Sequence, residues 1–218
     1  MNNFIVFDFE TDGTDSATCN PTQLACLTID PYNLNIIENS FFCSDIKPYE
    51  IDDPQYFTDE RMDAIKWHAS NKKCTTQEII EQWKNAPPEK TVWTNLVQHV
   101  NKCNPKNSQW TAPVPCGANI KNFDLVIAAR LNERYKVNKL FNYEIVDIRD
   151  LAFLSLMWDR SLTKRTMDSL RKYYGIPATN SHDALQDCKD EAIIITRYLK
   201  FFKATFNRIK YKGCMKPE

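Results

Sequence analysis

The stretch Asn3-Phe4-Ile5-Val6-Phe7-Asp8-Phe9-Glu10, close to the beginning of the chain, decides the fold that the sequence predicts. Its β-branched and aromatic residues are typical of a buried central strand. Because side chains alternate along a strand, Asp8 and Glu10 would lie on one face at its end. The pair therefore suggests a paired acidic site, although an ordinary strand end that reaches solvent explains Asp-x-Glu taken alone.

Further strands are expected beside this one. The segments Gln23 to Asp30 and Asn35 to Cys43 flank the turn-forming cluster Asp30-Pro31-Tyr32-Asn33, which predicts an antiparallel hairpin next to the first strand. Val114 to Gly117 and Tyr143 to Ile148 are predicted to be later strands. Strands that are followed by alternating strands and helices indicate an α/β architecture.

The longest helical region is predicted from Thr58 to Lys102, with a capping box that begins at Thr75 and a break at Pro87-Pro88. It would form small helices that cover the sheet. The remaining predicted helices run from Asp124 to Tyr135, from Thr166 to Tyr174 and from Asp183 to Phe202, while Asn104 to Pro113 is expected to be a surface loop.

The composition of the chain fits one globular domain. It has 218 residues, 43% of them hydrophobic, and a formal net charge of +0, which argues against bulk coating of nucleic acid. Its cysteines form no Cys-x-x-Cys pair, and no signal segment opens the chain, so reduced thiols in a cytoplasmic protein are expected. No apolar run approaches the roughly 20 residues that cross a bilayer, so no membrane partner is predicted.

Two later segments carry the other chemically suggestive side chains. Asp124 falls in the first turn of a predicted helix, where an aspartate also simply favours the helix dipole. His182 precedes the last helix, and Asp187 lies in its second turn. Each has an ordinary structural explanation by itself. The ordered combination of Asp-x-Glu, Phe-Asp and His-x-Ala-x-x-Asp is the unusual feature.

These motifs resemble those of the DEDDh exonucleases of the ribonuclease H-like superfamily, which include proofreading exonuclease subunits, ribonuclease T and oligoribonuclease. Asp8-Phe9-Glu10-Thr11 is similar to the first motif, Asn119 through Phe123-Asp124 to the second, and His182 through Asp187 to the third. The lead-in to the second motif departs from the family, because Ala118-Asn119 stands where His-Asn is usual.

The resemblance implies an α/β, ribonuclease H-like fold, with a central mixed five-stranded sheet, an antiparallel hairpin and flanking helices. The whole chain, 1–218, would be one exonuclease domain. Its parts would be N-terminal strands in 1–45, a helical insert in 58–103, the remaining strands and helices in 113–203 and a basic tail in 204–218.

The resemblance also implies a reaction. Two divalent cations, Mg²⁺ or Mn²⁺, would be held by the carboxylates, with Asp8 bridging both, Glu10 and Asp187 completing one site and Asp124 holding the second. His182 would be the general base. Thr11, Asn119 and Phe123 would contact the substrate. The expected function is hydrolysis of single-stranded nucleic acid, DNA rather than RNA, from its 3′ end to nucleoside 5′-monophosphates, and the family includes homodimers.

Other functions remain open at this stage. A 3′-5′ exoribonuclease or oligoribonuclease fits the same motifs, and a non-catalytic nucleic-acid or protein binding module could share the fold. An endonuclease is a further alternative within the superfamily, and zinc sites are disfavoured by the spacing of cysteines and histidines. Basic residues, among them Arg165, Arg171 and Lys172, together with the aromatic and basic tail, could hold a single strand or could be ordinary helix surface.

Overall fold

β1 (Phe4–Thr11) is the central strand of a five-stranded sheet with the order β3-β2-β1-β4-β5. The computed structural model describes residues 1–104, 110–138, 140–157, 159, 162, 164–177 and 183–208, without the side chains of 207 and 208. The other strands are β2 (Pro21–Ile29), β3 (Phe42–Asp45), β4 (Val114–Gly117) and β5 (Val146–Asp147). β1 pairs with β2 and β2 with β3 in antiparallel fashion, whereas β1 and β4, and β4 and β5, are parallel. The predicted mixed five-stranded sheet is confirmed.

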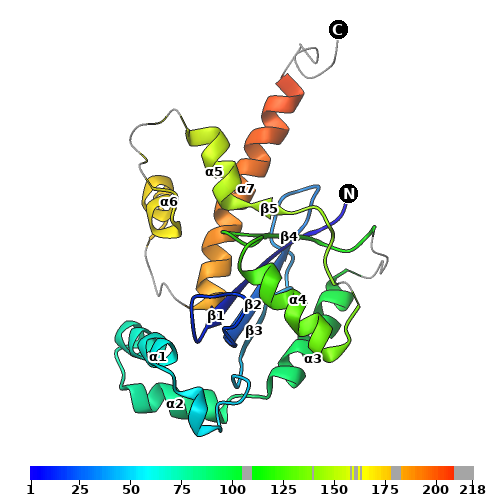
Figure 1. Ribbon diagram of the computed structural model, residues 1–218. Coiled ribbons are helices and arrows are strands. Elements are labelled where there is room, and N and C mark those ends of the chain that lie inside the picture. Colours follow the sequence, from blue (N-terminus) through cyan, green and yellow to red (C-terminus); the bar gives the residue numbers. More distant parts are fainter. Residues whose placement is uncertain are drawn as a thin grey trace.

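Helices cover both faces of this sheet (Figure 1). One core cluster joins β1 and β2 to α3 and α4, and a second joins β1, β2 and β4 to α5, α6 and α7. The helices are α1 (Asp59–Lys72), α2 (Thr76–Asn85), α3 (Glu89–Cys103), α4 (Asp124–Tyr135), α5 (Ile148–Leu156), α6 (Met167–Tyr174) and α7 (Ala184–Arg208). The predicted capping box at Thr75 is present at the N-terminus of α2.

Successive side chains of β1 point alternately into the cores on the two faces of the sheet. Ile5, Phe7 and Phe9 are buried in the cluster that includes α3 and α4. Val6 is buried in the cluster that includes α7. Because side chains two apart share a face, Asp8 and Glu10 continue the face of Val6 and lie on the α7 side.

The predicted strand from Asn35 to Cys43 is wrong over most of its length, since β3 begins only at Phe42. Asn39 has a φ of 61°, in the left-handed region, which interrupts an extended chain. The backbone N–H of Thr28 is satisfied by the Ser40 hydroxyl at 2.9 Å instead of by a strand carbonyl. Only an isolated bridge, between Ile29 and Ile36, precedes β3 on this side.

The predicted strand from Tyr143 to Ile148 is shorter in the structure, where β5 comprises Val146–Asp147. Asp147 ends the strand because it is also the N-cap of α5 and accepts a hydrogen bond from the N–H of Arg149. The last helix is longer than predicted and continues past Phe202 to Arg208.

The helices α1 and α2 pack on each other through a small core of their own, which includes Ile65, Ile79 and Trp83. Within the described residues, no helix is both long and apolar enough to cross a membrane. The described cysteines are all free thiols, and Cys19, Cys26, Cys116 and Cys188 are buried, as expected for cysteines that act as small apolar residues.

Candidate active site

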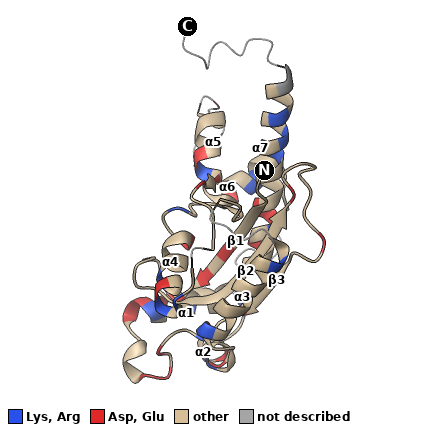
Figure 2. Cartoon of the chain, turned by 90° about the vertical axis from the view of Figure 1, so that its right-hand side faces the viewer, with Lys and Arg blue, Asp and Glu red and all other residues tan. Residues whose placement is uncertain are grey.

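Three of the predicted carboxylates meet at the centre of the sheet. Asp8, Glu10 and Asp187 each offer an oxygen, and these oxygens all lie within 4.8 Å of one another. Asp8 and Glu10 come from β1, whereas Asp187 comes from the first turn of α7, more than 170 residues further along the chain. Figure 2 shows the acidic segments of β1 in the middle of the fold, with helices on either side.

Asp124 contacts the same strand from α4, which packs on the face of the sheet opposite to α7. β4 pairs with β1 only from Phe4 to Val6, so the next backbone N–H groups on that edge of β1 have no strand partner. Asp124, in the first turn of α4, fills the gap, and its Oδ1 accepts a hydrogen bond of 3.1 Å from the N–H of Phe9. Its carboxylate is therefore fixed to the backbone between Asp8 and Glu10, and its side chain is buried.

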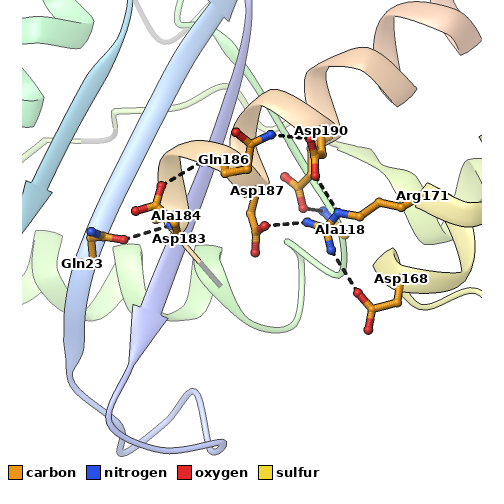
Figure 3. Close-up of polar contacts among 10 residues, drawn as sticks. Gln23, Ala118, Asp168, Arg171, Asp183, Ala184, Gln186, Asp187 and Asp190 are labelled. Carbon is orange, nitrogen blue, oxygen red and sulfur yellow. Dashed lines mark hydrogen bonds and ion pairs between the residues drawn. The ribbon is translucent and has the colours of Figure 1, made fainter. Parts of the chain in front are cut away.

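The position of Asp187 follows from how α7 packs on the sheet. At the first residue of the helix, the N–H of Ala184 donates to the side chain of Gln23 on β2 at 2.9 Å (Figure 3). One turn later, the buried thiol of Cys188 lies 3.4 Å from the carbonyl oxygen of Ala25. These contacts anchor α7 against β1 and β2 on both sides of Asp187.

Sequence reasoning missed a further carboxylate, Glu191. It is buried, and its Oε1 accepts a hydrogen bond of 3.1 Å from the N–H of Ala118, just beyond β4. Its Oε2 is buried without a hydrogen-bond partner among the described residues. The available signal was spacing, because residues four apart share a helix face, so Glu191 follows Asp187 along α7.

The electrostatics of the cluster reflect burial and mutual repulsion. Burial, followed by the charge of Asp187, raises the pKa of Glu10 to about 8. Burial raises the pKa of Asp124 to about 7, against the opposing effect of its hydrogen bond from Phe9. Burial and the neighbouring acids, Asp124 first, raise the pKa of Asp8 and of Glu191 well above the ordinary range. The cluster thus holds protons tightly unless positive charge compensates it.

A divalent cation fits this chemistry. Two carboxylates repel each other by up to about 4 kcal/mol at 4 Å and an effective dielectric constant near 20. Hard cations such as Mg²⁺ and Mn²⁺ prefer oxygen ligands. The converging oxygens of Asp8, Glu10 and Asp187, with an unpaired Glu191 oxygen in the same neighbourhood, therefore form a donor set suited to such ions.

A pocket of about 490 Å³ opens beside Glu10. It lies between the end of β1 and the exposed face of α1, and the side chain of Trp67 there is 44% exposed. The ring Nε2–H of His68 donates to the carbonyl oxygen of Thr11 at 2.8 Å, which ties α1 to the end of β1. The lining residues are Glu10, Thr11, Gly13, Thr14, Glu60, Asp63, Ala64, Trp67, His68 and Phe123.

The predicted substrate contacts fall in different places. Thr11 and Phe123 both line the pocket beside Glu10. Asn119 is not among its lining residues; it has a φ of 65°, its N–H donates to Asp147, and its side chain accepts from Asn122. Its described contacts are thus those of a turn that joins β4 to α4. His182 lies outside the described residues.

One member of the predicted basic cluster is not on the surface. Arg171 is 3% exposed, and its guanidinium group is enclosed by aspartates from α6 and α7. The expectation that this arginine could hold a nucleic-acid strand is therefore wrong. Figure 2 shows other basic residues along the far half of α7.

Comparisons with known proteins give matches in structure rather than in sequence. No protein-family model matches the chain, and no curated protein matches its sequence. E. coli exonuclease I in complex with a dT13 oligonucleotide matches with a TM-score of 0.67 and 18% identity, over 99% of this chain and 46% of that chain. Cell-death related nuclease 4 (CRN-4) matches with a TM-score of 0.66 and 18% identity, over 92% of this chain and 64% of that chain.

A 3′-exonuclease that recognises the histone mRNA stem-loop matches with a TM-score of 0.62 and 15% identity, over 92% of this chain and 82% of that chain. This chain spans less than half the length of exonuclease I. At these identities the likeness establishes the fold, which is that of the ribonuclease H-like exonucleases, as the sequence motifs predicted.

Proposed function

We propose that this chain is a divalent-metal-dependent 3′-5′ exonuclease of the DEDDh type that degrades single-stranded nucleic acid. The observation that carries the proposal is the convergence of Asp8, Glu10 and Asp187 within 4.8 Å, on a fold shared with exonucleases. Asp124, fixed to the backbone of the same strand, supplies the fourth carboxylate. The structure of an E. coli exonuclease I complex with single-stranded DNA has been determined with zinc bound, which supports a metal site in this fold.

Each carboxylate has a distinct proposed role. Asp8, at the centre of the cluster, would bridge two cations, Mg²⁺ or Mn²⁺. Glu10 and Asp187 would complete one site, and Asp124 would hold the other. When bound, such ions polarise the attacking water and stabilise the leaving oxygen in phosphodiester hydrolysis. His182, which comes shortly before α7 in the chain, would accept the proton of that water, since an imidazole with a pKa near 6.5 is a suitable base at neutral pH.

The pocket beside Glu10 would receive the 3′-terminal nucleotide. Thr11 would meet the terminal sugar, and Phe123 with the exposed Trp67 would offer apolar surface to the base. An end bound there lies next to Glu10, so the last phosphodiester would be the one cleaved. This geometry favours stepwise removal of terminal nucleotides as 5′-monophosphates over internal cleavage.

We infer single-stranded DNA as the preferred substrate. The matches to exonuclease I with bound dT13 and dA16 oligonucleotides, each with a TM-score of 0.67, support this choice. The alternative, an exoribonuclease, is supported by the match to the histone mRNA 3′-exonuclease, with a TM-score of 0.62. Matched DNA and RNA strands of one sequence, compared in one time course, decide between them.

The central test is digestion of a 3′-labelled single strand by the purified protein with Mg²⁺ or Mn²⁺. Labelled mononucleotide is expected at the earliest times, and a chelator should abolish its release. Asp8→Ala and His182→Ala should each lower the rate at least 100-fold, given that a general base alone contributes roughly 10²- to 10⁴-fold. Asp150→Ala is the matched control, because that aspartate is exposed and pairs with Lys121 away from the cluster.

Chelator-resistant cleavage would contradict the metal assignment. Digestion of a circular single strand, which has no 3′ end, would identify an endonuclease instead. Binding of the strand without any cleavage would favour a non-catalytic module of the same fold.

A further inference from the structure

Arg171, in the second turn of α6, is the positively charged group that contacts Asp187 most directly in the described part of the chain. Its Nη2 donates to Oδ1 of Asp187 at 2.5 Å, and its Nε donates to Oδ2 of Asp190 at 2.6 Å. Its Nη1 donates to Oδ1 of Asp168 at 3.1 Å. Figure 3 shows the guanidinium group held between these carboxylates from α6 and α7.

The three contacts differ in burial. The side chains of Arg171 and Asp190 are 4% and 2% exposed, and Asp190 also accepts a hydrogen bond of 2.8 Å from Gln186. The side chain of Asp187 is 16% exposed, whereas that of Asp168 is 77% exposed. The pair with Asp190 is therefore a buried anchor, and the contact with Asp168 is an outer, solvated one.

Asp187 is thus shared between two groups of partners. One of its oxygens accepts from Arg171, and the residue also contributes an oxygen within 4.8 Å of those of Asp8 and Glu10. Repulsion from Asp8 and Glu10 acts to turn the Asp187 side chain away from the cluster. The guanidinium group, itself anchored by Asp190 through Nε, opposes that rotation because its Nη2 holds Oδ1 of Asp187 from a set direction.

We propose that Arg171 is a positioning residue that holds Asp187 in the orientation needed to bind a divalent cation together with Asp8 and Glu10. The inference rests on the proposed metal-dependent function and adds a specific device to it. The arginine acts through geometry: it orders a ligand before the cation arrives, so that less side-chain freedom is lost on binding.

A rival role is that of a simple counter-charge, and the two roles predict different results for conservative variants. Arg171→Lys keeps the positive charge but replaces the planar fork by a point charge on a flexible stem. If Arg171 acts by geometry, Arg171→Lys weakens cation binding. If it acts only as a counter-charge, Arg171→Lys binds cations like the wild type, and Arg171→Met, which removes a charge that repels cations, binds them more tightly.

The experiment is calorimetric titration of Mn²⁺ into the whole protein without nucleic acid. Arg171→Lys is expected to bind Mn²⁺ at least tenfold more weakly than the wild type, which is about 1.4 kcal/mol. Asp168→Asn is the matched control, since it neutralises the exposed partner of the same arginine, and it should stay within twofold of the wild type. An unchanged Mn²⁺ affinity in a folded Arg171→Lys variant would overturn the proposal.

A second variant tests the same idea if the arginine variants do not fold. Asp190→Asn keeps Arg171 and its contact with Asp187 but replaces the charged anchor by a neutral amide of similar shape. Its Mn²⁺ affinity should fall at least threefold, and an affinity equal to that of the wild type would again refute a positioning role.

Activity measurements distinguish this inference from the proposed function. In Arg171→Lys, the rate at low Mn²⁺ should fall at least tenfold and return toward the wild-type value as Mn²⁺ is raised, with an unchanged KM for the strand. A uniform loss at every Mn²⁺ concentration would indicate a merely structural role and would overturn the inference. A wild-type protein that neither binds Mn²⁺ nor cleaves would instead refute the proposed function itself.

Discussion

Glu191 places a carboxylate on the face of α7 that carries Asp187, one helical turn further along the chain. Its Oε1 satisfies the N–H of Ala118, and its Oε2 is buried without a described hydrogen-bond partner. Burial and the charge of Asp124 raise its pKa well above the ordinary range, so that in the metal-free protein the side chain is protonated over a wider range of pH.

Two substitutions at Glu191 should distinguish the contribution of its hydrogen bond to stability from that of its charge. Glu191→Gln keeps an acceptor for the N–H of Ala118 and resembles the protonated acid, so the free energy of unfolding should change little at neutral pH in chelator. Glu191→Ala leaves that N–H buried and unpaired, and it should lower the free energy of unfolding by roughly 1–3 kcal/mol relative to Glu191→Gln. Urea denaturation measures both variants. Equal destabilisation would show that the hydrogen bond to Ala118 contributes nothing.

At the scale of elements, α1 forms one wall of the pocket beside Glu10, and α2 packs against α1. Their own small core, with Ile65, Ile79 and Trp83, holds them together, and the hydrogen bond from His68 to Thr11 fixes α1 to β1. The face of α1 toward the pocket carries Ala64 and the half-exposed Trp67. These two residues give an apolar surface next to the acidic cluster, on a helix face that also carries Glu60 and Asp63.

Removal of the exposed ring on α1 should therefore weaken substrate binding rather than chemistry. Stacking of a base on an aromatic side chain contributes roughly 1–3 kcal/mol. We expect Trp67→Ala to raise the KM for a single strand about tenfold or more with little change in kcat. Steady-state kinetics on a labelled strand check this.

Trp110→Ala is the matched control, because Trp110 is 66% exposed and is not among the pocket residues. A loss of kcat in Trp67→Ala with an unchanged KM would show that α1 does not form the substrate wall.

At the scale of the whole molecule, a chain of formal net charge +0 gathers acidic side chains at its centre. The carboxylates of Asp8 and Glu10 come from β1 and that of Asp124 from α4. Those of Asp187 and Glu191 come from α7. Burial raises the pKa values of Asp8, Glu10, Asp124 and Glu191 because both the sheet and the covering helices exclude water from these groups. The stability of the metal-free fold should consequently depend on pH.

The raised pKa values determine whether stability rises or falls with pH. The pKa of Glu10 is raised from 4.5 to about 8 and that of Asp124 from 3.8 to about 7, so the folded protein keeps protons that the unfolded chain releases. The contribution of these groups to stability is present below their unfolded pKa values. This contribution is lost as the pH rises through the pKa values that the groups have in the folded protein. The free energy of unfolding in chelator should therefore fall between about pH 4 and pH 8.

Urea denaturation across this range, with and without Mn²⁺, provides the measurement. Saturating Mn²⁺ should reduce the fall, because cations replace the protons of the cluster. Glu10→Gln should flatten the upper part of the curve, since it removes the group with the pKa of about 8. A wild-type curve that does not fall with pH in chelator would contradict the raised pKa values.

The sequence by itself determined the elements whose signals are local. Alternation placed Asp8 and Glu10 on one face of β1, and the capping box at Thr75 and the helix from Asp124 to Tyr135 lie where local patterns predicted them. The expected strand from Asn35 failed because the left-handed conformation at Asn39 and the bond from Thr28 to Ser40 interrupt the extended chain.

Only the tertiary structure decided which distant groups share the centre of the sheet. Arg171, predicted as part of a surface basic cluster, is a buried partner of Asp187, and the only sequence signal for Glu191 was its spacing of four residues from Asp187. Local patterns report on a residue's own strand or helix, whereas these partners are set by how α6 and α7 pack on the sheet. Burial then fixes their charges and pKa values, because desolvation depends on every layer that covers a group.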